Sequence, residues 1–242
     1  MNYYQKGNYI NMDKGFENPQ LVITADELMN NLDDKNNCIV DTRPTHEYMN
    51  GHIPGALHLD LFGLSLINTT PEMFDAFMWM IAYLFQQRGI DPTKTIIWYE
   101  DISGTRASRG LWFCEYLEHT KTRLLDGGYK AWLAADGPVS TEGVIPPAVT
   151  PFTGEPQRHL HLSADSIHEQ LNQDDFIRLD TRTEDEHYGR VARAERAGAI
   201  PGSIHIEWLN NLDENGAFKT AQELRELYEP VGITPEKQIM CY

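Results

Sequence analysis

Residues 40–61 read VDTRPTHEYMNGHIPGALHLDL: the end of an apolar strand closed by Asp-Thr-Arg, then a polar segment, then a Gly-His-Ile-Pro-Gly turn that leads into a second apolar run. The second half of the chain repeats both parts. Residues 177–182 read IRLDTR, and residues 198–208 read GAIPGSIHIEW. The segment between the two motifs is eight residues longer in the second half. A strand motif and a turn motif that recur in the same order indicate an internal duplication.

Two further matches extend the duplication. TADELMNNL at residues 24–32 resembles SADSIHEQL at residues 163–171, and each begins with a residue that favours a helix N-cap. RGIDPTKTIIWY at residues 88–99 resembles VGITPEKQIMCY at residues 231–242. Each copy therefore alternates helix, strand, Gly-Pro turn, strand, helix and strand. This pattern predicts an α/β fold with a mainly parallel sheet flanked by helices in each copy.

A proline-rich segment separates the two copies. Residues 137–158 hold five of the 13 prolines, which is typical of an extended linker. We therefore expect four parts: an N-terminal extension at residues 1–18, a first repeat at residues 19–140, a linker at residues 141–158 and a second repeat at residues 159–242.

Composition excludes several classes of protein. The net charge of −16 argues against a nucleic-acid binder or a binder of anionic membranes, because broad phosphate surfaces would not be neutralised. The most apolar run, residues 74–85, is too short to span a bilayer, and the polar N-terminus does not resemble a signal peptide. Cys38, Cys114 and Cys241 have neither metal-site nor disulfide-framework spacing. We expect a cytoplasmic protein without a membrane segment, metal or cofactor.

Three stretches carry a resemblance to a known family. Residues 40–61 resemble the first signature of the rhodanese family, and LLDGGYKAW at residues 124–132 resembles the second-helix region of the same domain. Residues 213–242 resemble the stretch that leads to the catalytic loop in tandem-domain sulfurtransferases. The resemblance covers about residues 20–242. It implies a thiosulfate or 3-mercaptopyruvate sulfurtransferase of two rhodanese-like domains, in which the second domain carries the catalytic cysteine.

In that family a strand ending in Tyr is followed by Cys-x-x-Gly-x-x-Ala or a close variant. The cysteine thiolate takes the sulfane sulfur of a donor and passes it to a thiol or cyanide. Backbone N–H groups of the loop and the helix dipole stabilise the thiolate. In the first repeat the cysteine position is Glu100 by strand register, or Asp101 by counting back from Gly104 and Arg106. A carboxylate cannot carry a sulfane sulfur, so we expect the first repeat to be non-catalytic.

In the second repeat Tyr242 aligns with Tyr99, and the expected cysteine would come directly after it. We therefore expect the second domain to be incomplete, no catalytic residue within the chain, and no activity of these 242 residues alone. Cys241 is the alternative nucleophile. It aligns with Trp98 inside the strand, which favours a buried structural thiol.

The resemblance also assigns roles near the expected site. The family's counterpart of Arg182 binds the anionic donor, and a guanidinium suits an oxyanion because it offers paired N–H donors. The alternative for Arg182 is an ordinary salt bridge, for example to Glu186. Asp180 and Tyr242 are expected to be structural residues beside the site, with Asp180 accepting hydrogen bonds from loop N–H groups.

The expected partners are a small anionic sulfur donor and a thiol or cyanide acceptor. Two other functions stay open. One is a non-catalytic rhodanese-like module that binds or regulates. The other is a phosphatase or arsenate reductase with a Cys-x5-Arg loop, although the first repeat has no cysteine in the corresponding loop.

Overall fold

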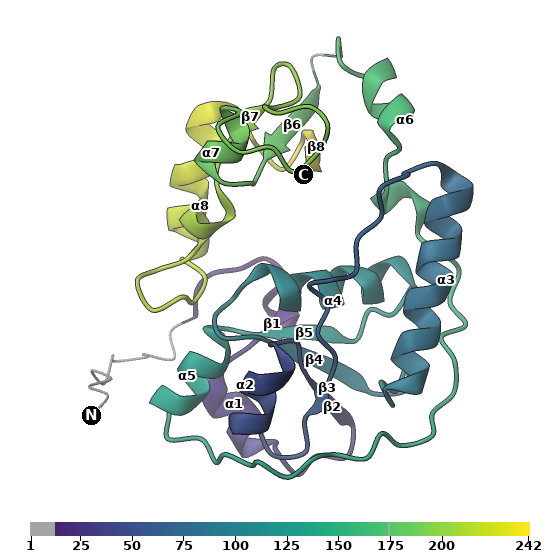
Figure 1. The fold of residues 1–242 in the computed structure, drawn as a ribbon. Helices are drawn as coiled ribbons and strands as arrows, with labels where there is room; N and C mark the ends of the chain where they lie inside the picture. Colours follow the sequence, from purple (N-terminus) through teal and green to yellow (C-terminus); the bar gives the residue numbers. More distant parts are fainter. Residues whose placement is uncertain (1–12, 174) are drawn as a thin grey trace. The chain divides into compact units, whose positions relative to one another are not determined.

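The computed structural model describes residues 13–173 and 175–242, which divide into two compact units (Figure 1). Among the described residues, the first unit comprises residue 13, residues 17–161 and residues 214–218. The second unit comprises residues 14–16, 162–213 and 219–242. The main stretch of the second unit begins at residue 162, slightly later than residue 159, where we expected the second repeat to start. Residues 214–218, which we expected in the second repeat, belong to the first unit.

The first unit is built around a five-stranded sheet in the order β1-β5-β4-β2-β3, with every neighbouring pair parallel. Its strands are β1 (Val22–Ile23), β2 (Asn37–Asp41), β3 (Leu57–His58), β4 (Thr95–Tyr99) and β5 (Thr122–Leu125). Its helices are α1 (Ala25–Asn30), α2 (Thr45–Asn50), α3 (Pro71–Gln87), α4 (Thr105–Tyr116) and α5 (Gly128–Ala134), with the short 3-10 helices η1 (Pro19–Leu21) and η2 (Arg158–Leu160).

Alternate side chains of the central strands point to opposite faces of this sheet. Val40 and Trp98 pack with residues of α3 and α4 on one face. Ile39 and Ile97 pack with residues of α1 and α5 on the other. The two apolar layers explain why β2 and β4 are continuous hydrophobic runs, as expected for parallel strands covered on both sides.

The second unit contains a three-stranded parallel sheet in the order β7-β6-β8. Its strands are β6 (Phe176–Asp180), β7 (Ile204–His205) and β8 (Gln238–Cys241). Its helices are α6 (Ala164–Glu169), α7 (Glu184–His187) and α8 (Ala221–Tyr228), with the 3-10 helices η3 (Trp208–Asn211) and η4 (Glu229–Val231). Its buried apolar core is smaller and centres on Leu179, Ile206 and Ile233.

Helix starts confirm part of the sequence analysis. Thr24 caps α1 by accepting a hydrogen bond from the Glu27 N–H, and Ser163 caps α6 in the same way from Ser166. The side chain of Glu27 pairs with Arg123 at 2.6 Å.

The strand register establishes which residues of the two units correspond. Val40 is paired with Trp98 where β2 meets β4, and Leu179 is paired with Cys241 where β6 meets β8. One step further, the Thr181 N–H donates to the Tyr242 carbonyl at 2.9 Å, as the Thr42 N–H does to the Tyr99 carbonyl at 2.9 Å. The predicted alignment of Tyr99 with Tyr242 is therefore confirmed.

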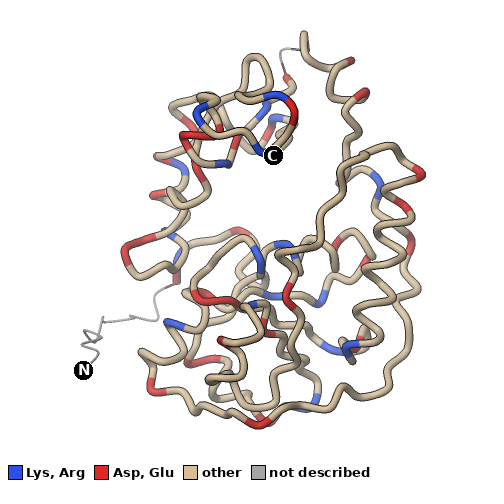
Figure 2. Tube along the Cα trace, in the orientation of Figure 1, with Lys and Arg blue, Asp and Glu red and all other residues tan. Residues whose placement is uncertain are grey.

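The distribution of acidic residues and the lengths of the apolar helices agree with what the composition indicates. Acidic positions are spread over both units (Figure 2). Within the described ranges, no helix combines the length and the apolar character needed to cross a membrane. The apolar run at residues 74–85 lies inside α3, which buries Phe74, Met78, Ile81 and Phe85 on one side.

Candidate functional site

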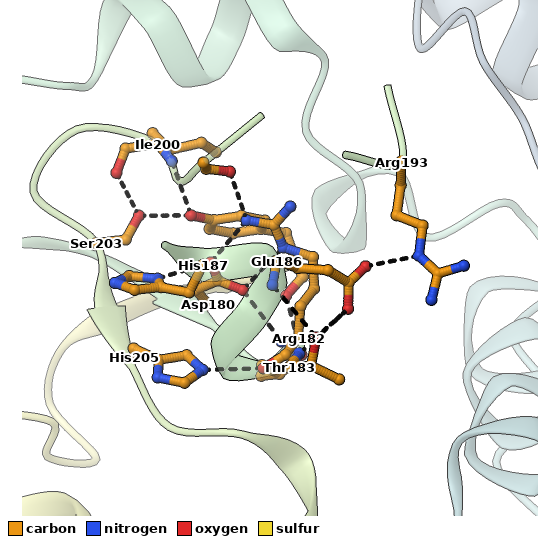
Figure 3. A network of polar contacts seen from close by, with 12 residues as sticks. Asp180, Arg182, Thr183, Glu186, His187, Arg193, Ile200, Ser203 and His205 are labelled. Carbon is orange, nitrogen blue, oxygen red and sulfur yellow. Dashed lines mark hydrogen bonds and ion pairs between the residues drawn. The ribbon is translucent and has the colours of Figure 1, made fainter. Parts of the chain in front are cut away.

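A buried carboxylate forms the centre of the site at the carboxyl end of β6 (Figure 3). Asp180 is fully buried. Its Oδ1 accepts hydrogen bonds from the backbone N–H of Arg182 at 3.0 Å and from Nε of Arg182 at 2.9 Å, and its Oδ2 accepts one from Nη2 at 2.7 Å. Burial acts to raise the pKa of Asp180, but the hydrogen bonds from Arg182 and His187 outweigh it and hold that pKa well below its usual value. Asp180 is therefore ionised.

The guanidinium of Arg182 is held on one edge and open on the other. Besides Asp180, Nη2 donates to the carbonyl of Gly198 at 3.0 Å, and the guanidinium carbon lies 4.9 Å from the ring centroid of Tyr242. Among the described residues we find no hydrogen bond from Nη1, and 29% of the side chain is exposed. Nη1 can therefore offer its N–H groups to an anion.

The sequence analysis offered Glu186 as a salt-bridge partner of Arg182, and this prediction is wrong. Its salt bridge is made with Asp180, because the two residues flank the sharp turn after β6. Glu186 is engaged elsewhere: it forms a capping box with Thr183 at the start of α7 and accepts a hydrogen bond from Nε of Arg193 at 3.1 Å. Within the part of the chain that the structure describes, Asp180 accepts one backbone N–H, from Arg182, and its other bonds go to side chains.

Tyr242 ties the strand end to the Gly-Ala-Ile-Pro-Gly turn. Its hydroxyl accepts a hydrogen bond from the Ile200 N–H at 2.9 Å and shares one with the Ser203 hydroxyl at 2.8 Å (Figure 3). Its carbonyl accepts hydrogen bonds from both the N–H and the hydroxyl of Thr181, each at 2.9 Å. These contacts fit the structural role predicted for Tyr242.

Two histidines complete the centre, and the sequence analysis missed both. Nδ1 of His187 lies 2.9 Å from Oδ2 of Asp180. The ring of His187 stacks on that of His205 with centroids 4.5 Å apart, and Nε2 of His205 donates to the Arg182 carbonyl at 2.9 Å. The repeat alignment places His187 at the position of Tyr48, so it gave no signal for a contact with Asp180.

Cys241 differs from expectation. It lies in β8 as predicted, but it is exposed rather than buried. Because side chains alternate along extended backbone, Cys241 and Tyr242 point to opposite faces. Although the residue as a whole is exposed, the chain packed around its thiol desolvates the sulfur and raises its pKa, which opposes formation of a nucleophilic thiolate.

The corresponding loop of the first repeat is filled by its own carboxylate. Oε1 of Glu100 accepts hydrogen bonds from the backbone N–H groups of Arg106 at 2.6 Å and Ala107 at 3.2 Å, in the first turn of α4. A Cβ at Gly104 would lie 2.5 Å from the same oxygen. Burial is the main cause that raises the pKa of Glu100. Asp101 is more exposed, with Oδ1 3.8 Å from Nη1 of Arg43.

Within residues 13–173 and 175–242, no three His, Cys, Asp or Glu side chains gather in an arrangement that could hold a metal ion. The described centre instead presents one ionised carboxylate, one guanidinium with an open edge and two imidazoles. These groups can bind and orient a small anion.

The chain is similar to members of a known protein family. A family model described as the rhodanese-like domain matches residues 24–135. The sulfur carrier protein TtuD of Thermus thermophilus is 30% identical over 248 residues, which cover 94% of this chain and 84% of that protein. The thiosulfate sulfurtransferase of Azotobacter vinelandii is 29% identical over 230 residues, covering 94% and 83%.

Solved structures show the same fold. The 3-mercaptopyruvate sulfotransferase SseA of Escherichia coli superimposes with a TM-score of 0.79 at 24% identity, over 91% of this chain and 87% of that one. The anaerobic ergothioneine biosynthesis enzyme of Chlorobium limicola superimposes with a TM-score of 0.77 at 23% identity, over 93% of this chain and 61% of that one.

Proposed function

Because the chain belongs to the rhodanese family of thiosulfate and 3-mercaptopyruvate sulfurtransferases, we propose that the protein transfers a sulfane sulfur through a cysteine persulfide in its second repeat. The donor is thiosulfate or 3-mercaptopyruvate, and the acceptor is cyanide or a thiol. The observation that carries the proposal is the Asp180–Arg182 centre, which presents the open Nη1 edge of a guanidinium beside the end of β8.

We place the nucleophile at the position that follows Tyr242. Strand register supports this position, because Tyr242 is the counterpart of Tyr99 and the residue after Tyr99 is Glu100. In the first repeat that position directs a carboxylate to the backbone N–H groups that begin α4. A cysteine thiolate at the equivalent place would receive the same kind of stabilisation. No residue of the present chain is then the nucleophile.

The remaining roles follow from the contacts. Arg182 binds the oxyanion of the donor through Nη1, Asp180 fixes the guanidinium, and Tyr242 holds the turn at residues 198–202 against the strand end. The first repeat, residues 19–140, is non-catalytic because Glu100 fills its loop. The second repeat, residues 159–242, is of the catalytic type. A reducing compartment such as the cytoplasm suits a free thiol nucleophile, and all three cysteines are free.

The reaction consists of two displacements on sulfur. The thiolate attacks the sulfane sulfur of thiosulfate, a sulfur–sulfur bond to the enzyme forms, and the bond to the sulfonyl sulfur breaks. Sulfite leaves with that electron pair. Cyanide or a thiolate then attacks the outer sulfur of the persulfide, and the enzyme thiolate is released. Arg182 neutralises charge on the donor oxygens during the first displacement.

The proposal is tested by thiocyanate formation from thiosulfate and cyanide. We expect no turnover from the 242-residue chain, and turnover from the protein extended through a cysteine after Tyr242. Turnover by the 242-residue chain that disappears in Cys241→Ser would show that Cys241 is the nucleophile and that our position is wrong.

One observation favours a second function, a non-catalytic module that binds or regulates. Glu100 shows that one copy of this loop has an acid where the nucleophile would be. An acidic residue after Tyr242 in the encoded protein would make both repeats non-catalytic and would favour this second function.

A further inference from the structure

Helix α3 is apolar on both of its sides, although the described chain buries only one of them. The inner side packs into the core of the first unit through four residues: Phe74, Met78, Ile81 and Phe85. On the outer side Trp79 is 72% exposed, Tyr83 51% and Met73 47%. A helix that is apolar all round is normally buried. The outer side of this 17-residue helix therefore indicates a surface that binds a partner.

The outer residues of α3 have the spacing of a helix–helix contact. They recur at intervals of three and four along the sequence: Met73, Ala76, Met80, Tyr83 and Gln87. These are the intervals by which the contact positions of paired helices repeat. Trp79 lies next to this row, and its ring stacks on that of Tyr83 with centroids 6.0 Å apart. We call these six residues the α3 seam.

Charge limits what can lie against the α3 seam. Residues 76–87 contain no Lys, Arg, Asp or Glu, whereas the whole chain has a net charge of −16. Helices that bind membrane surfaces carry Lys and Arg along their polar side, but from residue 71 to 88 the charged residues are Glu72, Asp75 and Arg88. So acidic a protein is also repelled by anionic lipid. An uncharged apolar helix can cover the seam without burying a charge, and a second copy of the chain supplies one.

The α3 seam is complementary to itself in shape. In an antiparallel pair of helices, a two-fold axis between Trp79 and Met80 places Tyr83 of one copy opposite Ala76 of the other. The large tyrosine ring thus meets the smallest side chain of the seam, which lets the two helices interlock. Trp79 of one copy meets Met80 of the other at the axis. This match of large with small side chains favours a second copy over an unrelated partner.

The area of the α3 seam is sufficient for a reversible dimer. An aromatic side chain buries about 150–250 Å², so the exposed parts of Trp79 and Tyr83 together offer roughly 250 Å² per copy. Met73 and the polar ends of the seam, where Gln87 of one copy can donate to Glu72 of the other, raise the area of the pair to roughly 1,000 Å². Specific interfaces begin at about this size. The pairing is therefore expected to be weak and dependent on concentration.

We propose that the protein forms a homodimer through the α3 seam, with the two α3 helices antiparallel about a two-fold axis near Trp79. The helix belongs to the first unit, whereas the Asp180–Arg182 centre belongs to the second. The proposal therefore goes beyond the proposed function and does not depend on it. It gives the non-catalytic repeat a role in assembly.

The experiment is sedimentation velocity of the 242-residue chain from about 1 to 100 μM, a range that covers weak pairing. We expect the dimer fraction to rise with concentration. Trp79→Glu and Trp79→Lys each place a charge at the axis and should weaken pairing by about thirtyfold or more, as the loss of a central aromatic residue does. An equimolar mixture of these two variants should associate again, because the axis brings the opposite charges at position 79 together.

Met49→Glu is the matched control, because Met49 is 65% exposed on α2 of the same unit and should leave pairing unchanged. All three variants should unfold at the wild-type temperature by circular dichroism, since both positions are exposed. A wild-type chain that stays monomeric at every concentration would overturn the inference. Association that persists in Trp79→Glu, or a mixture of the Glu and Lys variants that stays monomeric, would do the same. Binding to phosphatidylcholine vesicles that Trp79→Glu abolishes, without a dimer, would assign the α3 seam to a lipid surface instead.

Discussion

Arg43 in the first repeat and Arg182 in the second each hold an aspartate two residues earlier and a glycine carbonyl from the following turn. Nη2 of Arg43 donates to Asp41 at 2.6 Å and to the Gly51 carbonyl at 2.7 Å, and the corresponding distances for Arg182 are 2.7 Å and 3.0 Å. The bonds are alike, but the exposure differs: 4% for the Arg43 side chain against 29% for Arg182.

The covering of Arg43 explains that difference. Its guanidinium lies 3.8 Å from the ring centroid of Tyr129 on α5, and Asp101 stands 3.8 Å from Nη1. Asp101 lies at Nη1, the edge that is open in Arg182, and the Tyr129 ring covers a face of the guanidinium. The comparison teaches that the Asp-Thr-Arg motif by itself forms a rigid ion pair, and that its neighbours decide whether the guanidinium can receive a ligand.

The largest expected effect tests the burial of the two ion pairs. Asp41→Ala leaves the Arg43 cation buried without its partner, which should lower the free energy of unfolding by about 3–5 kcal/mol. Asp180→Ala should cost less, about 1–3 kcal/mol, because water can reach Arg182. Hydrogen exchange measured separately on peptides of the two repeats gives both values. Equal losses would contradict the difference in exposure.

The next effect compares how two carboxylates respond to pH. The pKa of Glu100 is raised by burial, so between its ordinary value near 4.5 and the folded value the folded state binds more protons, and stability falls as the pH rises. Glu100→Gln keeps an acceptor for the α4 N–H groups and should remove this loss. The measurement is urea unfolding of both proteins from pH 4 to 7. A difference in unfolding free energy between the wild type and Glu100→Gln that stays constant from pH 4 to 7 would contradict a raised pKa of Glu100.

Asp180 should show the opposite sign. Its hydrogen bonds hold its pKa below the ordinary value of 3.8, so its contribution to stability is present above that value and is lost as the pH falls toward the folded pKa. The advantage of the wild type over Asp180→Asn should therefore shrink on acidification below pH 4, measured by the same unfolding titration. An advantage that grows at low pH would show that Asp180 is not held ionised by Arg182 and His187.

The smallest effect concerns the tyrosines at the strand ends. Tyr242→Phe removes the hydroxyl that bonds Ile200 and Ser203 and should cost about 1 kcal/mol. Tyr99→Phe removes a longer bond to the Ile53 N–H, at 3.2 Å, and is the matched control. We expect urea unfolding to show a loss of unfolding free energy for Tyr99→Phe that is no larger than the loss for Tyr242→Phe. A clearly larger loss for Tyr99→Phe would show that the two hydroxyls are not equivalent.

Much of the framework could be predicted because it depends on local patterns. The match between RGIDPTKTIIWY at residues 88–99 and VGITPEKQIMCY at residues 231–242 was enough to align Tyr99 with Tyr242. The N-caps at Thr24 and Ser163 follow from side-chain chemistry within one turn of helix.

The parts that were missed depend on contacts between distant positions. The exposure of Cys241 depends on which residues cover one face of β8, and this cannot be predicted from the sequence of the strand alone. The bond from His187 to Asp180 depends on where a short helix turns after the strand. The repeat alignment pairs His187 with Tyr48, whose hydroxyl bonds the Ala56 carbonyl, so it gave no sign of the contact with Asp180.

Glu100 has a consequence for the chemistry of the first repeat as a whole. Its carboxylate is covalently attached a few residues from the N–H groups that it contacts, so it competes as an intramolecular ligand with a high effective concentration. Free anions at cellular levels would have to displace a tethered competitor that never diffuses away. In the first repeat a tethered carboxylate thus holds the N–H groups that would otherwise be open to an exchangeable anion.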